Sequence, residues 1–328
     1  MPVDVELLRD AAARRWMHFM LRGDFESAWR ESSFIDSTGY QDPHKLWNGE
    51  CWSGKRVMIR CLHGLGDAIQ FIRYAPLLRQ TCRLLTVQTH PRLVTLLQMV
   101  DGVDKAVTWN EGEGNWDVQM EIMELPRAFG TSLSTIPADV PYIRLTSEQR
   151  RWAAALVPKT ARLNVGLVWQ ASAWNPNRSI PLNVLAPILE LDGFRFYGLQ
   201  KEMTESIPGL RDIEKHATAI SDTAALMSQM DLIISVDTMT AHLAGALGKP
   251  VWILLPVDAD WRWMLDRHDS PWYPTAALFR QSRPGDWSAT IDEVTESLVS
   301  LSASHVQRKC EEKVIPQLAS ALRMTAMK

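Results

Sequence analysis

Two short segments of the sequence place a carboxylate directly after an apolar run, which is where α/β proteins bind ligands. The first runs from His63 to Asp67, and its glycines Gly64 and Gly66 predict a tight turn that a ligand can approach closely. Asp67 stands at the start of the helix expected next, where a carboxylate caps free N–H groups or takes a proton. The residues leave both interpretations open, a helix cap and a catalytic base. A dinucleotide-binding fingerprint is excluded, because Ile69 stands where G-x-G-x-x-G requires glycine or alanine.

The second segment follows the apolar run at 232–235 and carries Asp237, Thr238, Thr240 and His242 at the start of a helix of small residues. Free N–H groups at a helix start suit a diphosphate, and the threonine hydroxyls add donors. His242 on the first turn could face the same ligand. The alternative is a capping aspartate with a histidine whose nitrogens are satisfied in the core.

Arg178 is a single cation in the polar loop at 171–179, and a guanidinium can clamp phosphate oxygens with two hydrogen bonds. The alternative is an exposed arginine without a role. Asp258 and Asp260 match the DxD pattern of metal-dependent sugar transferases, but three residues are too short a match for us to expect a metal. The sequence contains no phosphate-loop, zinc-protease or nucleophile-elbow motif.

Alternating strands and helices predict an α/β fold with two parallel sheets, each covered by helices on both faces. The first region has strands expected at 56–61, 84–89, 103–109 and 116–120, and helices at 68–80 and 91–99. The same order restarts in the second region, with strands at 164–169, 195–199, 232–235 and 251–255, and helices at 182–189, 223–230 and 240–247. Residues 137–141 and 147–159 are the expected connection between the two domains.

Both ends of the chain are expected to be helical. Residues 5–31 predict two helices separated at Gly23-Asp24, and the stretch at 22–28 resembles part of a tetratricopeptide repeat. The tail at 305–328 is expected to be helical apart from Pro316. We therefore divide the chain into a helical hairpin and linker (1–48), a first Rossmann-like domain (49–150), a second Rossmann-like domain (151–304) and a helical tail (305–328).

Composition excludes several classes of protein. The 328 residues carry a net charge of −3, so no general attraction for nucleic acid is expected. The four cysteines form neither a zinc pattern nor a disulfide framework, and the N-terminus lacks the pattern of a signal peptide. The apolar runs are too short to span a bilayer. We expect a cytoplasmic protein. Most of the 14 tryptophans are expected in packing roles, and a few could line a sugar or base site.

The motifs together resemble glycosyltransferase family 9, which includes the heptosyltransferases of lipopolysaccharide core assembly. The likeness is greatest to the branch found behind tetratricopeptide repeats in bacteria, and it covers roughly residues 50–300. It is carried, in order, by residues 63–74, 165–169, 177–181, 222–226, 231–237, 241–250, 260–263 and 270–274. The resemblance implies a GT-B fold: two Rossmann-like, doubly wound parallel-sheet domains facing a cleft, here with a short N-terminal helical hairpin. It also implies that the domain at 49–150 holds the acceptor and the domain at 151–304 binds the nucleotide sugar.

The resemblance also implies roles for individual residues. Asp67 falls on the family's general base, in a cleft turn with Gly64, Gly66 and Gln70. Arg178 falls where heptosyltransferases usually have a phosphate-binding lysine. The nucleotide-binding positions are Asp237, Thr238, Met239, Thr240, His242 and, by a loose placement, Glu202. Two residues depart from the pattern: Arg178 replaces lysine, and Met239 replaces a small residue and could crowd a diphosphate.

The first hypothesis for function is a metal-independent, inverting glycosyltransferase that needs no cofactor and takes its sugar from a nucleotide-diphosphate donor. A non-catalytic binding or scaffold protein of the same fold is the alternative, favoured by Met239 and the isolated hairpin. Another nucleotide-sugar enzyme, such as an epimerase or hydrolase, is the third. A glycan, a lipid-linked sugar or a protein could each be the acceptor, and peripheral membrane contact stays open. The sequence fixes neither the nucleotide, the sugar nor the oligomeric state.

Overall fold

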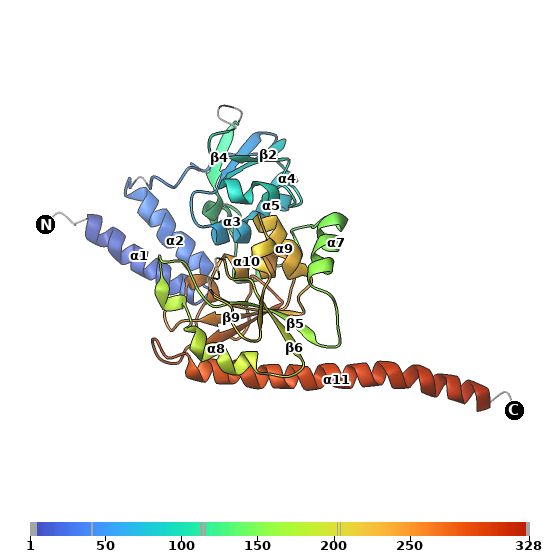
Figure 1. The fold of residues 1–328 in the computed structure, drawn as a ribbon. Coiled ribbons are helices and arrows are strands. Elements are labelled where there is room, and N and C mark those ends of the chain that lie inside the picture. The colour runs from blue at the N-terminus through green and yellow to red at the C-terminus, as the bar shows by residue number, and fades with distance from the viewer. Residues whose placement is uncertain are drawn as a thin grey trace.

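The structure, a computed structural model, describes residues 5–40, 42–111, 114, 116–201, 203 and 205–325, with side chains described as far as residue 307. The described residues form two parallel sheets of four and six strands, one in each half of the chain. Figure 1 shows the two sheet domains stacked on each other, with helices between them and a helical pair beside them. The predicted architecture of two Rossmann-like domains is confirmed.

The N-terminal sheet has the order β3-β2-β1-β4 and is parallel throughout. Its strands are β1 (Arg56–Arg60), β2 (Leu84–Thr89), β3 (Lys105–Thr108) and β4 (Val118–Glu121). The chain runs outward from β1 to β3 and then returns to the other side of β1. The gap between the ends of β1 and β4 is therefore the switch point, where ligands bind in such sheets.

The C-terminal sheet has the order β10-β9-β8-β5-β6-β7, again parallel. Its strands are β5 (Leu163–Val168), β6 (Phe194–Gly198), β7 (Leu210–Asp212), β8 (Leu232–Val236), β9 (Val251–Leu255) and β10 (Ala276–Arg280). This is the full Rossmann order, with its switch point between β5 and β8. Strands β5 and β8 are buried at every position, which explains their continuous apolar character. Strands β7 and β10 were not predicted.

Helices connect the strands and flank the two sheets in the chain. In the N-terminal half they are α1 (Val5–Leu21), α2 (Phe25–Ser37), α3 (Leu65–Phe71), α4 (Ala75–Arg79), α5 (Val94–Leu97) and α6 (Leu125–Ala128). In the C-terminal half they are α7 (Ser147–Leu156), α8 (Leu182–Leu189), α9 (Ile220–Ser228), α10 (Met239–Ala246) and α11 (Ser288–Thr325). Single 3₁₀ turns are η1 (Ile72–Tyr74), η2 (Pro91–Leu93), η3 (Ile122–Glu124), η4 (Leu133–Thr135), η5 (Pro176–Arg178), η6 (Glu214–His216) and η7 (Trp261–Trp263). The predicted connection between the domains contains α7.

The N-terminal helices form the expected pair and pack on the rest of the molecule through aromatic rings. Gly23 takes a left-handed conformation (φ +74°) between them, and the Asp24 carboxylate accepts a hydrogen bond from Ser27 N and caps α2. The Trp16 and Phe25 rings lie 6.0 and 6.4 Å from the Trp261 ring of the C-terminal domain. The predicted packing role of the tryptophans is confirmed at this junction.

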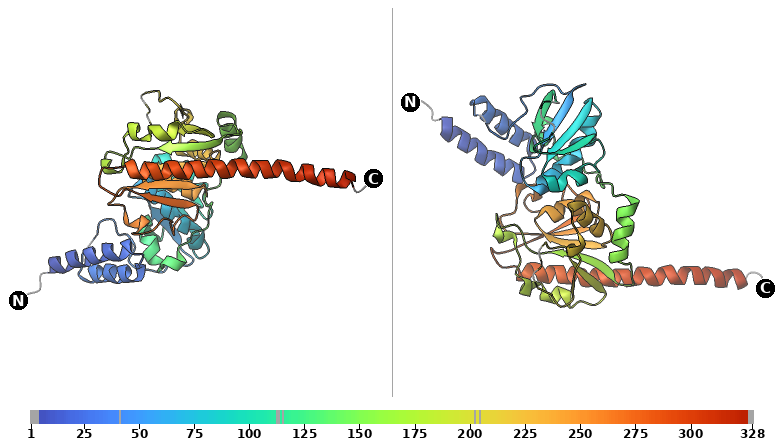
Figure 2. Two further views of the ribbon diagram at one scale, coloured as in Figure 1. Left: turned by 90° about the horizontal axis from the view of Figure 1, so that it is seen from below. Right: turned by 45° about the horizontal axis from the view of Figure 1, so that its top comes forward.

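The last helix, α11, is long and continuous. Figures 1 and 2 show it crossing the C-terminal domain and then projecting well beyond the body of the molecule. Its first turns bury Ile291, Val294 and Leu298 against that domain. The helix passes residue 304 without a break and also continues through Pro316, where we expected an interruption. None of the described helices combines the length and apolar character needed to cross a membrane.

The two domains meet at α3 and α10, which pack directly on each other. A Cβ added at Gly66 would lie 2.8 Å from His242 Cδ2 and 3.6 Å from Met239 Cα. The tight turn predicted at Gly64–Asp67 is wrong, because α3 already begins at Leu65 and Gly64 has an ordinary φ of −66°. Gly66 is needed instead for the close approach of two helices. One apolar core extends from the N-terminal sheet through this contact into α9 and α10.

A substitution in α10 tests how closely this helix packs at its interface with Tyr273 of the same domain. Gly245→Ala would place a Cβ 2.2 Å from Cδ1 of the buried Tyr273 ring. Helix propensity alone predicts a gain of up to about 1 kcal/mol. Overpacking predicts a loss of about 1–3 kcal/mol, and we expect the loss. Urea denaturation measures the sign, and a stabilised variant would show that this interface has room.

Candidate functional site

The predicted site residues gather at the switch points of the two sheets. Arg178 lies in the loop after β5, and Asp237 directly follows β8. Arg178 Nη1 lies 3.4 Å from Asp237 Oδ2, so these two loops are joined by an ion pair. Asp67 lies in the first turn of α3, next to Gly66, which touches the start of α10. The two segments that suggested chemistry are therefore neighbours across the domain boundary.

Arg178 is mostly buried. Its side chain is 17% exposed, and its guanidinium lies 5.3 Å from the exposed ring of Trp174. Nε has no hydrogen-bond partner among the described residues. Burial raises the pKa of Asp237, and the charge of Arg178 opposes that rise. The interpretation of Arg178 as an exposed arginine is wrong. It is a mostly buried cation that pairs with Asp237 and still has an N–H group, on Nε, without an acceptor among the described residues.

The start of α10 is formed as expected, but His242 is turned into the core. Thr238 is the N-cap in an extended conformation, and Thr240 is buried. His242 Nδ1 lies 3.0 Å from the Tyr273 hydroxyl, and its ring stacks on Trp263 at 5.3 Å. Burial and the surrounding arginines lower the pKa of His242 well below its usual value. A neutral histidine satisfied in the core is the interpretation that these contacts favour.

Asp67 has two partners. Its Oδ2 accepts a hydrogen bond from Gly64 N at 2.9 Å, which confirms the capping interpretation. Its Oδ1 lies 2.6 Å from Nη2 of Arg262, which belongs to the C-terminal domain. The side chain is 24% exposed, so the carboxylate also meets solvent. Its role as a base stays a prediction.

Arg262 crosses from η7 into the N-terminal domain, and the sequence interpretation gave it no role. Its Nε donates to Gln70 Oε1 at 2.8 Å, and its Nη1 lies 2.8 Å from Asp260 Oδ1. Gln70, predicted to lie in the cleft turn, is fully buried in α3 and serves this contact. Asp260, from the DxD pattern, is therefore engaged by Arg262.

Arg73 of η1 makes the reciprocal crossing. Its Nη1 donates to the carbonyl oxygens of Pro137 and of Trp272 in the C-terminal domain. Its guanidinium lies 4.6 Å from the centre of the Tyr273 ring and 5.1 Å from that of Tyr142. Among the described side chains, no carboxylate forms an ion pair with Arg73, so carbonyl oxygens and aromatic rings stabilise its charge.

Glu121 is a second residue that the sequence interpretation missed. It is the last residue of β4, at the switch point of the N-terminal sheet, one residue beyond the strand expected at 116–120. Its Oε2 lies 4.0 Å from His63 Nε2 and accepts from Met123 N at 2.6 Å. Its Oε1 accepts no hydrogen bond from the described residues. Burial raises the pKa of Glu121 to about 7 and lowers that of His63.

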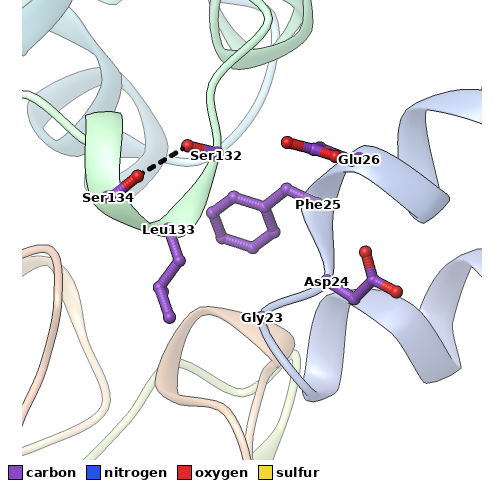
Figure 3. Close-up of a pocket in the computed structure, with 7 residues that line it drawn as sticks. All are labelled: Gly23, Asp24, Phe25, Glu26, Ser132, Leu133 and Ser134. Atoms are coloured by element: carbon purple, nitrogen blue, oxygen red, sulfur yellow. Dashed lines mark hydrogen bonds between the residues drawn. The ribbon is translucent and has the colours of Figure 1, made fainter.

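The remaining residue predicted for the site, Glu202, lies outside the described residues. Within the described ranges, no three histidine, cysteine, aspartate or glutamate side chains are grouped to hold a metal. A hollow of about 410 Å³ lies between the α1–α2 turn and η4, lined by Gly23–Glu26 and Ser132–Ser134 (Figure 3). It contains none of the predicted site residues and no cation, so we place the site at the switch points.

Comparison with known proteins gives one curated sequence relative, and no family model matches the chain. The relative, protein FlbA of Caulobacter vibrioides, is 25% identical over 308 residues. That match covers 82% of this chain and 50% of FlbA, so the chain spans about half the length of the curated relative.

Solved structures share the fold. The glycosyl transferase family 9 protein from Veillonella parvula matches with a TM-score of 0.56 and 13% identity, over 78% of this chain and 98% of that one. E. coli ADP-heptose LPS heptosyltransferase II matches with a TM-score of 0.54 and 13% identity, over 76% of this chain and 99% of that one. The predicted GT-B fold and the resemblance to family 9 are confirmed at the level of the fold.

The buried carboxyl of Glu121 predicts a pH-dependent stability. Its folded-state pKa is about 7, whereas an unfolded glutamate titrates near pH ~4.3. The native state therefore holds an extra proton between these values, and its stability falls as the pH rises through this window. Glu121→Gln cannot ionise, so the difference between its free energy of unfolding and that of wild type should rise in its favour by on the order of 1–3 kcal/mol from pH 4.5 to pH 8. Denaturant unfolding at both pH values measures this, and a constant difference would contradict it.

Proposed function

We propose that this chain is a glycosyltransferase that moves a sugar from a nucleotide-diphosphate donor to an acceptor hydroxyl. The observation that carries the proposal is Arg178, a mostly buried cation whose Nε has no partner among the described residues, at the switch point of a full Rossmann sheet. The start of α10 adds backbone N–H groups beside it. A carboxylate from the other domain, Asp67, lies across the α3–α10 contact.

The residues supply a coherent reaction. Asp67 takes the proton of the acceptor hydroxyl while the hydroxyl oxygen bonds to the anomeric carbon from the face opposite the diphosphate. The bond from that carbon to the diphosphate oxygen breaks, and the nucleoside diphosphate leaves with the electron pair. Arg178 and the N–H groups at the start of α10 stabilise the charge that develops on it. Attack from the opposite face inverts the anomeric centre, and no step requires a metal.

A non-catalytic binding protein of the same fold is the alternative, and one observation favours it. Met239, the first residue of α10, packs against the core, with its Cα 3.6 Å from the position of a Cβ at Gly66. The helix start that would hold the diphosphate is therefore closely covered by α3. Nucleotide binding without transfer would establish this alternative.

Nucleotide binding is the first test of the proposal. ADP is the first probe, because the E. coli structural relative is named for ADP-heptose, and UDP, GDP and CDP complete the panel. A ligand at about 100 times its Kd should stabilise the chain by about 2.7 kcal/mol in a thermal-shift assay. Arg178→Gln should weaken that ligand about tenfold or more, because a charged donor is lost.

Arg162→Gln is the matched control for that measurement. Arg162 is exposed and precedes β5, so it lies at the opposite end of the strand from the Arg178 loop. It should bind the nucleotide like wild type. No stabilisation by any nucleoside diphosphate would refute the proposal.

The role of Asp67 is tested by transfer. Asp67→Asn should lower the transfer rate about 10²–10⁴-fold while the donor still binds, because the amide cannot accept the proton. Asp222→Asn is the control, since Asp222 caps α9 from the same third position of the helix. That variant should lose some stability and keep its transfer rate. Unchanged transfer by Asp67→Asn would remove the residue from the base role.

A further inference from the structure

Arg262 links the proposed phosphate site to the proposed base, because it forms an ion pair with Asp67. Every nitrogen of its guanidinium has a partner: Nε donates to Gln70, Nη1 to Asp260 and Nη2 to Asp67. Nη2 also lies 4.0 Å from the sulfur of Met123. The Arg262 side chain is 8% exposed, whereas those of Asp260 and Asp67 are 37% and 24% exposed. The buried cation therefore meets two carboxylates at its solvent side, and the three groups together carry one net negative charge.

The surroundings of Arg262 would let its head group move without losing its position. The guanidinium lies 4.6 Å from the centre of the Trp261 ring and 5.4 Å from that of Phe71. Aromatic faces attract a cation without fixing the direction of its N–H groups. The Nη groups can thus exchange oxygen partners while the rings keep the guanidinium in place.

Arg262 also belongs to the surroundings of the proposed phosphate site. Trp263, the next residue, stacks on His242 in the first turn of α10 with 5.3 Å between the ring centres. Gly66, next to its partner Asp67, lies against the start of the same helix, since a Cβ there would be 3.6 Å from Met239 Cα. Arg262 and Arg178 therefore both lie beside the place where the proposed function puts the diphosphate. One of them, Arg262, is occupied by the carboxylate that the reaction needs.

We propose that Arg262 is a charge-exchange residue: it pairs with Asp67 when the site is empty and turns to the diphosphate when the donor binds, which releases Asp67. This inference rests on the proposed function and deepens it. While Asp67 Oδ1 accepts from the Arg262 guanidinium, the guanidinium stands where the acceptor hydroxyl would have to approach that oxygen. The exchange opens this oxygen to the hydroxyl only when a donor is present.

Reciprocal coupling gives the exchange a distinctive test. If Asp67 competes with the diphosphate for Arg262, then Asp67→Asn should bind nucleoside diphosphate about fivefold or more tightly than wild type. Arg262→Gln should bind about tenfold or more weakly. In the Arg262→Gln background, adding Asp67→Asn should change the affinity by less than about twofold, because the competition is gone.

Isothermal titration calorimetry of the four proteins with ADP, UDP, GDP, CDP and inorganic pyrophosphate measures this cycle. Asp258→Asn is the matched control, since it removes one negative charge from an exposed side chain two residues from Asp260. It should bind within about twofold of wild type if general electrostatics is not the cause. Should Arg262→Gln fail to fold, the comparison of Asp67→Asn with wild type and the control decides alone.

The outcomes separate the two proposals. Tighter binding by Asp67→Asn and not by Asp258→Asn supports the exchange. Equal or weaker binding by Asp67→Asn, or equal gains in both variants, overturns the exchange and leaves the proposed function standing. Binding of no probe by wild type and Asp67→Asn overturns both, because neither the phosphate site nor the competition for it would exist.

Discussion

The arrangement of this site depends on two buried arginines, each of which reaches from its own domain into the other. Arg73 leaves the N-terminal domain to reach Trp272 and Tyr273, and Arg262 leaves the C-terminal domain to reach Asp67 and Gln70. A guanidinium taken out of water is strongly unfavourable unless its N–H groups and its charge find partners. Each domain supplies those partners for the other's arginine. Neither polar network is complete within one domain, so the two domains must keep one relative position.

The two arginines that cross the domain boundary also change how we expect the protein to respond to a ligand. Domains joined by a small polar interface move relative to each other by default. Here an apolar core continues through the contact of α3 and α10, and opening it would expose both arginines and the ring of Tyr273. Rearrangement of side-chain ion pairs is a smaller change than separating the domains. We therefore place the response to ligand at Asp67, Arg262 and Arg178 rather than in a hinge.

Much of the fold could be predicted because parallel strands covered on both faces are largely apolar runs, as β8 and β9 are. The short strand β7 has no such run, and α7 was taken for a charged connection. The positions of Asp67, Arg178 and Asp237 at the switch points could be predicted because these residues follow strands, and strand ends define the switch point. Arg262 and Glu121 could not, because their importance lies in what other segments place beside them. Gly66 was predicted to allow a tight turn, but it allows the close contact of α3 with α10 instead.

Asp67 is a helix cap and an ion-pair partner, and the proposed function adds a third role. The cap uses Oδ2 for Gly64 N, the ion pair uses Oδ1 for Arg262, and the proposed base would need a free lone pair directed at a hydroxyl. The cap is compatible with either of the other roles, because it occupies the second oxygen. The ion pair and the proposed base would share Oδ1, where the guanidinium restricts the approach of a hydroxyl. A site that neutralises its own cations with carboxylates is stable when empty, and a diphosphate is the kind of anion that can displace them.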